Sequence, residues 1–206
     1  MAGTKARART EILPVVLHAY PALDVDEDRF FEFCQQNRDL RIERTEGGDL
    51  EIMPPTGGET GSRNFIFNHL FAGWVLRDGT GTGFDSSAGF VLPNGATRSP
   101  NAAWIRRKRL AGLTGEQKQR FLPLCPDFVV ELCSPSDRLS VLQAKMEEYI
   151  ENGARLGWLV DVLDRRVYVY RPGKEPERLD KADEISGDPE LPGFVLDLRP
   201  IWAPGL

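Results

Sequence analysis

The sequence predicts an α/β protein, at the border with the α+β class, in which helices flank a central mixed β-sheet. Its elements follow the order helix, hairpin, helix, several strands, helix and strands, which suits a sheet with helices packed against it. The 206 residues are 41% hydrophobic and 28% charged, as expected for one domain with a full core. We therefore expect a single domain over residues 12–206, preceded by a flexible tail over residues 1–11.

The first half of the chain predicts two helices separated by a hairpin. Residues 25–37 form the first helix, with Asp24 as its cap. Strands over 40–44 and 50–53 then alternate around the turn at 46–49. Glu59 or Thr60 starts the second helix, which covers roughly 61–77 and has four core candidates: Phe65, Leu70, Trp74 and Val75.

The second half of the chain is richer in predicted strands. A strand over 84–92, a tight turn over 93–95 and a short strand over 102–105 lead into a partly helical excursion over 106–126. We expect a buried strand over 126–133 and a helix over 137–152 that stops at Gly153. Three further strands are expected, at 156–161, 166–170 and about 194–198.

Composition excludes several classes of protein. No apolar run reaches the ~18 residues of a membrane-spanning helix. The three cysteines, Cys34, Cys125 and Cys133, show no CxxC spacing, which argues against a disulfide framework or a zinc cluster and favours the cytoplasm. With two histidines, any bound metal should be a hard, oxygen-liganded ion such as Mg²⁺.

The charge balance gives no general signature of a DNA-binding protein. The net charge is -5, whereas non-specific DNA binders present an excess of Lys and Arg. Two local basic clusters occur, at 106–109 and at 165–166. Each is either a solvated surface or a site of phosphate contacts.

The buried strand is the most informative segment. Side chains alternate across a strand, so Asp127, Val129, Glu131 and Cys133 share one face. A buried carboxylate is costly unless it is paired or bound to a cation. Because Glu131 lies near the middle of the strand, we expect a lysine, an arginine or a divalent metal to compensate its charge.

The following helix supplies a candidate partner for Glu131. Lys145 lies at the edge of an apolar stripe, from which its side chain can extend toward the sheet. The stripe consists of Leu139, Leu142, Met146, Tyr149 and Ile150. The pairing of Lys145 with Glu131 is open to two interpretations: a structural ion pair in a regulatory or structural module, or part of an active site.

Two more residues favour the active site. Glu59 starts the second helix, and Asn101 precedes a short strand. Together with Glu131 and Lys145 they would suit Mg²⁺-assisted hydrolysis of a phosphodiester, which needs oxygen ligands for the metal and a cation near the phosphate.

A set of short motifs, in this order, resembles the PD-(D/E)XK nuclease superfamily and, within it, the Uma-type family of restriction-endonuclease-like proteins. The resemblance covers about residues 12–172. Its motifs are Met53–Glu59, Phe84–Phe90, Leu92–Gly95, Arg98–Asn101, Cys125–Glu131, Ser134–Ser136, Lys145 with Tyr149, and Gly157–Asp161. The resemblance implies a restriction-endonuclease-like fold, DNA as substrate and Mg²⁺ or Mn²⁺ as cofactor.

The resemblance also implies roles for four residues. Asn101 stands where the family has the Asp of its Pro-Asp pair, and Glu131 matches the second acidic residue. The superfamily lysine two positions later is Cys133 here, so Lys145 of the next helix supplies it. Glu59 matches a helix-start acid that can join the metal site. The implied metal ligands are Glu59, Asn101 and Glu131.

The asparagine at position 101 departs from the family pattern. It offers a neutral oxygen in place of an anion, so the site should bind Mg²⁺ more weakly. Asp127 lies about 13 Å from Glu131 along an extended strand and is expected at the start of that strand, outside the metal site. The sequence thus leaves two main functions: a metal-dependent DNA endonuclease, which could act as a homodimer, or an inactive nuclease fold that binds nucleic acid or protein.

Overall fold

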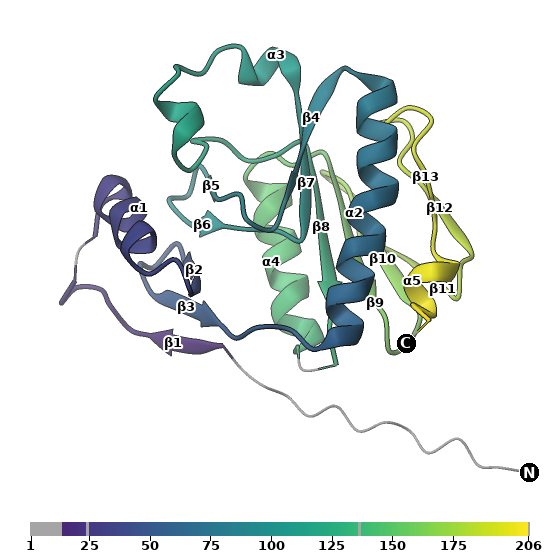
Figure 1. Ribbon diagram of the computed structural model, residues 1–206, viewed down its shortest axis with the longest axis horizontal. Coiled ribbons are helices and arrows are strands. Elements are labelled where there is room, and N and C mark those ends of the chain that lie inside the picture. The colour runs from purple at the N-terminus through teal and green to yellow at the C-terminus, as the bar shows by residue number, and fades with distance from the viewer. Residues whose placement is uncertain (1–13, 24, 136, 206) are drawn as a thin grey trace, which may run out of the picture.

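The computed structural model describes residues 14–23, 25–135 and 137–205. Within these residues, a six-stranded mixed sheet forms the centre of the protein (Figure 1). Strands β8 and β9 run parallel, and the other neighbours run antiparallel. The strand order is β11 (Glu177–Asp180), β10 (Arg166–Tyr170), β9 (Leu156–Asp161), β8 (Phe128–Cys133), β7 (Ala102–Arg106) and β4 (Gly81–Asp85). The predicted mixed sheet is confirmed.

Helices α2 (Gly58–Asp78) and α4 (Leu139–Glu151) cover opposite faces of this sheet. Strand β8 divides its side chains between them, because alternate residues point to opposite faces. Phe128 and Val130 pack with α2, whereas Val129 and Cys133 pack with Met146 and Tyr149 of α4. Glu131 is therefore on the α4 face of the sheet, as the sequence predicts.

A second, five-stranded antiparallel sheet of the described residues lies beside α4 (Figure 1). It contains the predicted hairpin, in which Arg41 pairs with Met53 and Arg44 pairs with Leu50. Helix α1 (Glu27–Gln36) packs Phe30 against this sheet. The strand order is β1 (Val15–Leu17), β3 (Leu50–Met53), β2 (Arg41–Arg44), β6 (Thr97–Arg98) and β5 (Phe90–Val91).

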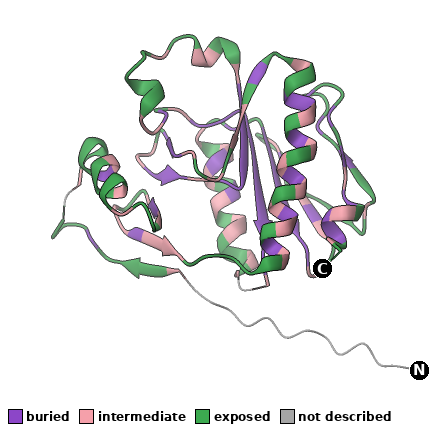
Figure 2. Ribbon diagram, viewed as in Figure 1, coloured by how far each residue is buried: buried purple, intermediate pink, exposed green. Residues whose placement is uncertain are grey.

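The remaining elements lie around the central sheet. The excursion before β8 holds α3 (Arg107–Leu110) and a 3-10 turn at Gln117–Gln119. The hairpin of β12 (Glu184–Ser186) and β13 (Val195–Asp197) and the short helix α5 (Arg199–Trp202) add to the core on the α2 side. Figure 2 shows buried residues concentrated in the central strands and on the faces of α2 and α4 that meet them. None of the helices in the described ranges has the length and apolar character that a bilayer crossing requires.

Two local predictions at the ends of elements were wrong. Asp24 was expected to cap the first helix, but the helix begins at Glu27 and its cap is Asp26, whose carboxylate accepts a hydrogen bond from Arg29 N at 2.8 Å. Asp24 itself lies outside the described residues. The strand predicted over 84–92 is two strands in different sheets, β4 and β5. They are separated by a turn in which Asp85 Oδ1 accepts a hydrogen bond from Ser87 N at 3.0 Å.

The core face of α2 also differs from the prediction. Phe65 is 76% exposed, whereas Phe67 and Phe71 are buried beside Trp74 and Val75. Two residues correspond to about 200° of rotation around a helix, so Phe65 and Phe67 point to nearly opposite sides. The row at 67, 71, 74 and 75 is the one with helical spacing.

Substitution of Gly81, at the start of β4, would test the packing of the central sheet. A Cβ at this position would overlap the indole ring of Trp104, which is buried. We expect Gly81→Ala to lower the free energy of unfolding by about 1–3 kcal/mol, because a packed core accommodates added volume poorly. Urea denaturation measures this, with Gly115→Ala as a control because a Cβ there meets open space. Equal stability of the two variants would contradict this packing.

Candidate active site

The ammonium of Lys145 lies between two buried carboxylates. Lys145 Nζ is 2.9 Å from Glu131 Oε1 and 2.9 Å from both carboxylate oxygens of Glu43. The residues Glu43 and Glu131 are 1% and 3% exposed. Burial of this kind is tolerated only with close pairing, so the three side chains depend on one another.

Each of the three side chains comes from a different element. Glu131 points from β8 toward α4, and Lys145 reaches the sheet from the edge of the packed face of α4. Glu43 belongs to β2, in the second sheet. The cluster therefore lies where the two sheets and α4 meet.

Arg98 of β6 holds the cluster on its other side. Its guanidinium is 2.6 Å from Glu148 of α4, 2.5 Å from Glu51 of β3 and 3.4 Å from Glu43. The backbone N–H of Ser99 donates to Glu43 Oε1 at 3.0 Å. Charge-assisted hydrogen bonds of this kind fix the carboxylate of Glu43 in place, and with it one side of Lys145.

The charges in this network shift the pKa values of its members. Burial alone would raise the pKa of Glu43, but Lys145, Arg98 and Arg41 together outweigh burial and lower it. Burial alone would lower the pKa of Lys145, but Glu131 and Glu43 outweigh burial and raise it. Glu43 is therefore ionised and Lys145 is protonated near neutral pH.

Tyr149 adds a hydrogen bond to Glu131. Its hydroxyl donates to Glu131 Oε1 at 3.3 Å, one helical turn from Lys145. Burial, and then the negative charges of Glu131 and Glu43, raise the pKa of Tyr149 well above its ordinary value. The hydroxyl thus keeps its proton and acts as a donor.

A cavity of about 200 Å³ opens onto this cluster. Its lining includes Asn101, Glu131 and Lys145, three of the four residues that the sequence predicted for the site. Asn101 Oδ1 accepts from the backbone N–H of Leu132 at 3.0 Å, and its Nδ2 donates to Asn64 Oδ1 at 3.2 Å. Asn101 is thus oriented by its neighbours next to Glu131.

Glu59 lies apart from these three residues. It belongs to the first turn of α2 and pairs with Arg63 at 3.2 Å, with 43% of its side chain exposed. It is absent from the described lining of the cavity, although Gly57 and Thr60 on either side line it. The structure brings Asn101, Glu131 and Lys145 together and leaves Glu59 outside this cavity.

The oxygen atoms that line the cavity could provide part of the coordination of a magnesium ion, with the remaining ligands coming from water or substrate. Among the described residues, no group of three His, Cys, Asp or Glu side chains could hold a metal alone. Glu131 and Asn101 would provide one carboxylate and one amide oxygen, which retains a second lone pair beside its bond to Leu132. Proteins commonly hold Mg²⁺ by one or two carboxylates, with water and substrate phosphate as further ligands.

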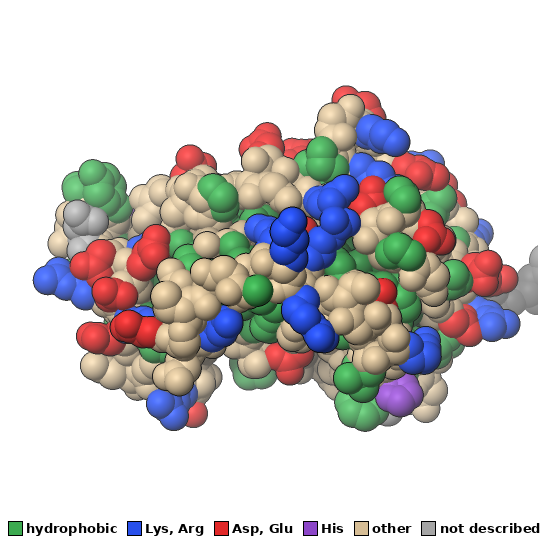
Figure 3. All heavy atoms as spheres, turned by 90° about the horizontal axis from the view of Figure 1, so that it is seen from above, with side chains coloured by type: hydrophobic (Ala, Val, Ile, Leu, Met, Phe, Trp, Pro, Cys, Tyr) green, Lys and Arg blue, Asp and Glu red, His purple; other side chains and the backbone are tan. Residues whose placement is uncertain are grey.

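The other acidic and basic residues predicted from the sequence lie away from the cavity. Asp127 accepts from Arg106 N at 2.9 Å and pairs with Arg109 at 3.2 Å, before the start of β8, as expected. Arg166 pairs with Asp164 and Asp180, each at 3.1 Å. Figure 3 shows Lys and Arg side chains gathered near the middle of the top face, where Figure 1 places α3.

Sequence analysis missed Glu43. The signal was present, because Glu43 follows Ile42 in a predicted strand and is as costly to bury as Glu131. The argument applied to Glu131 predicts a cationic partner for Glu43 as well. Only the packing of the hairpin against α4 shows that both carboxylates share Lys145.

Comparison with known proteins agrees with this fold. A family model described as "Uma2: Putative restriction endonuclease" matches residues 27–199, so the chain belongs to the Uma2 family. A crystal structure from Anabaena variabilis, described as "a putative nuclease belonging to DUF820", has a similar fold, with a TM-score of 0.67 and 17% sequence identity. The match covers 78% of this chain and 89% of that chain. No curated protein is significantly similar to this chain. The predicted restriction-endonuclease-like fold is confirmed.

Lys145→Met tests whether the two carboxylates depend on the ammonium. At pH 7 we expect a loss of about 3–5 kcal/mol in the free energy of unfolding, because Glu43 keeps its burial and loses its nearest cation. The exposed Lys174→Met is the matched control, with an expected change within about 0.5 kcal/mol.

The loss of stability caused by Lys145→Met should depend on pH. In the wild type the pKa of Glu43 is lowered, so its stabilising contribution is lost as the pH falls below the ordinary glutamate value of 4.5. In the variant, Glu43 loses the cation that lowers its pKa most, so it is protonated at a higher pH than in the wild type, and this protonation relieves the folded state. The difference between the two proteins should shrink from pH 7 toward pH 4. A difference that is constant with pH would contradict the charge pairing.

Proposed function

We propose that this protein is a metal-dependent phosphodiester hydrolase that acts on DNA, with its active centre at Glu131, Lys145 and Asn101. The observation that carries the proposal is the 2.9 Å contact between Glu131 and Lys145 in a cavity that Asn101 also lines. Membership of the Uma2 family supports it, because the family model is described as "Putative restriction endonuclease".

Glu131, Lys145 and Asn101 would have different roles in the hydrolysis. The ammonium of Lys145 would neutralise the negative charge that develops on the phosphate oxygens during hydrolysis. Glu43 also contacts the ammonium, so Lys145 would stay in place if Glu131 bound a ligand in the cavity. Asn101 presents its carbonyl oxygen in a fixed orientation, because Leu132 and Asn64 hold both ends of its amide.

A divalent cation, Mg²⁺ or Mn²⁺, would be held by Glu131 and Asn101, together with water and a substrate phosphate. When bound, it would supply Lewis-acid polarisation of the phosphate and a water of lowered pKa. Replacement of a family aspartate by Asn101 removes one negative charge, so the affinity for metal should depend strongly on bound DNA.

A second candidate function is binding of nucleic acid without cleavage. The specific observation is that the carboxylates nearest the cavity are already paired with Lys145, and the oxygen of Asn101 already accepts a backbone N–H. A cation entering this cavity would compete with those contacts.

Glu131→Gln tests the proposed chemistry. We expect the wild type to cleave DNA in the presence of Mg²⁺ or Mn²⁺, and we expect Glu131→Gln to lower the rate at least 100-fold, since the site loses its one carboxylate metal ligand. Cleavage of supercoiled plasmid and of labelled single-stranded DNA measures the rate. Glu59→Gln is the matched control, because Glu59 lies outside the cavity and should retain most activity. Equal cleavage by wild type and Glu131→Gln would refute the assignment.

Asn101→Asp separates the two candidate functions. A second carboxylate beside Glu131 should tighten Mn²⁺ binding about tenfold or more and raise the cleavage rate if the site is catalytic. Isothermal titration calorimetry with Mn²⁺ measures binding, and the plasmid assay measures the rate. Tighter metal binding with no cleavage in either protein would favour the binding function.

A further inference from the structure

One ridge of α2 faces a series of three adjoining cavities. Thr60, Asn64, Asn68, Ala72 and Leu76 recur every four residues and so form one inclined ridge on the helix surface. Thr60 lines the active-site cavity, Asn64 lines the next, and the other three line the third. At ~1.5 Å per residue, the ridge is about 24 Å long.

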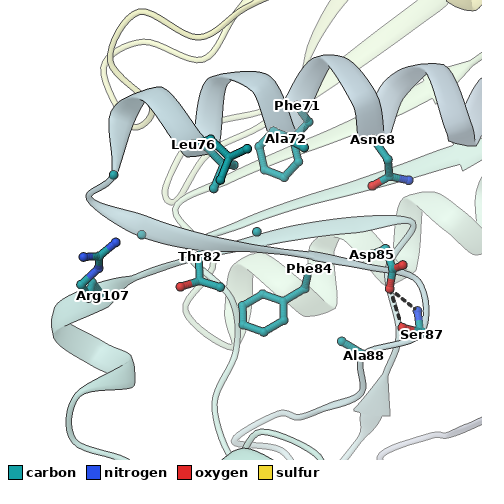
Figure 4. A pocket seen from close by; sticks show the side chains of 14 residues that line it. Asn68, Phe71, Ala72, Leu76, Thr82, Phe84, Asp85, Ser87, Ala88 and Arg107 are labelled. Carbon is teal, nitrogen blue, oxygen red and sulfur yellow. Dashed lines mark hydrogen bonds between the residues drawn. The ribbon is translucent and has the colours of Figure 1, made fainter.

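The three cavities are neighbours that share lining residues. The active-site cavity and the second cavity, of about 620 Å³, share Arg41 and residues 53–56. The second and the third, of about 700 Å³, share Ser87. Figure 4 shows the third cavity between α2 and β4, with Asn68 and Asp85 at one end and Arg107 at the other. We call this series of cavities the α2 groove.

The chemistry of the groove changes along its length. Near the active site its lining is polar and charged, with Arg41, Asn64 and Ser99 in the second cavity. Asn68 Nδ2 donates one hydrogen bond to Asn64 O at 2.9 Å, which orients its amide beside the cavity. The third cavity is mainly apolar, with Phe71, Phe84 and Leu76 in its lining. Leu76 is 84% exposed there.

We propose that the α2 groove binds a single, unpaired DNA strand that leads away from the scissile phosphate. The inference rests on the proposed function and names its substrate class. Bases would pack in the apolar third cavity against Phe84, and the phosphate backbone would contact Arg41 at the near end and Arg107 at the far end. Single-strand binding proteins commonly combine a few cations with base packing on aromatic side chains.

The charge of the protein favours a strand over a duplex. Duplex binders gain most of their affinity by neutralising many phosphates with Lys and Arg. This chain carries a net charge of -5, and the described lining of the second and third cavities holds three cations, Arg38, Arg41 and Arg107, beside the two carboxylates Asp39 and Asp85. Three cations can contact only a few phosphates, which is too few for the phosphate neutralisation on which duplex binders depend.

Binding measured without cleavage tests the inference separately from catalysis. In the Glu131→Gln background, fluorescence anisotropy would compare a twelve-nucleotide mixed-sequence DNA strand with the same sequence as a duplex. We expect the strand to bind at least tenfold more tightly. Ala72→Phe should fill the groove and weaken strand binding at least tenfold. His69→Phe is the matched control, because both positions are exposed on α2 and only Ala72 lines the groove.

A salt series tests the far end of the groove. Arg107→Ala should reduce the slope of log affinity against log salt by about 0.7, the value for one phosphate contact in a single strand. Lys174→Ala, a distant exposed lysine, should leave the slope unchanged.

The outcomes distinguish the inference from the proposed function. Three results would contradict strand binding in the α2 groove. They are equal or tighter binding of the duplex, equal strand binding by Ala72→Phe and His69→Phe, and no measurable binding of the strand. If Glu131→Gln abolishes cleavage while any of these results holds, the proposed function survives and the inference fails. Strand binding with the expected pattern but no cleavage by the wild type would support the groove and refute the hydrolase.

Discussion

The shared ammonium of Lys145 is the interaction on which the arrangement of this protein depends. Lys145 Nζ is 2.9 Å from Glu43 of the second sheet and 2.9 Å from Glu131 of the central sheet. Burial of each carboxylate carries a desolvation cost, and this one cation offsets part of that cost for both of them. The position of the hairpin sheet against α4 and β8 is therefore tied to one side chain, and Arg98 reinforces it by joining Glu43, Glu51 and Glu148.

The same contact explains why a structural and a catalytic interpretation of the Glu131–Lys145 pair need not exclude each other. The pair is part of a buried ion network, and it also borders a cavity with Asn101. Glu43 makes this double role possible, since it holds Lys145 independently of Glu131. A ligand that draws on the charge of Glu131 would leave the ammonium anchored and directed at the same cavity.

Local patterns predicted the centre of the site, and long-range packing determined the rest. Alternation along β8 placed Glu131 on the α4 face, and helical periodicity placed Lys145 at the edge of the packed stripe, because both signals depend on neighbouring residues alone. Glu43 was missed because its contact with Lys145 spans 102 positions of the chain.

Side-chain direction also limited the sequence predictions. Phe65 was expected in the core of the second helix, but it is exposed, and the buried side chains Phe67 and Phe71 face the sheet instead. Glu59 was expected beside the metal because it starts the helix, but it pairs with Arg63 one turn later. In both cases the residue type was informative, and its rotation about α2 decided its environment.

We propose that Glu131 and Asn101 supply oxygen ligands to a divalent cation, and that the ammonium of Lys145 lies beside it to neutralise the substrate phosphate. The most direct measurement is anomalous diffraction from crystals grown with Mn²⁺ and a non-cleavable DNA strand. The account predicts a Mn²⁺ peak within about 2.5 Å of a Glu131 carboxylate oxygen and of Asn101 Oδ1, with Lys145 still in contact with Glu43. A bound strand with no peak at Glu131, or with Mn²⁺ held at Glu59 alone, would contradict it.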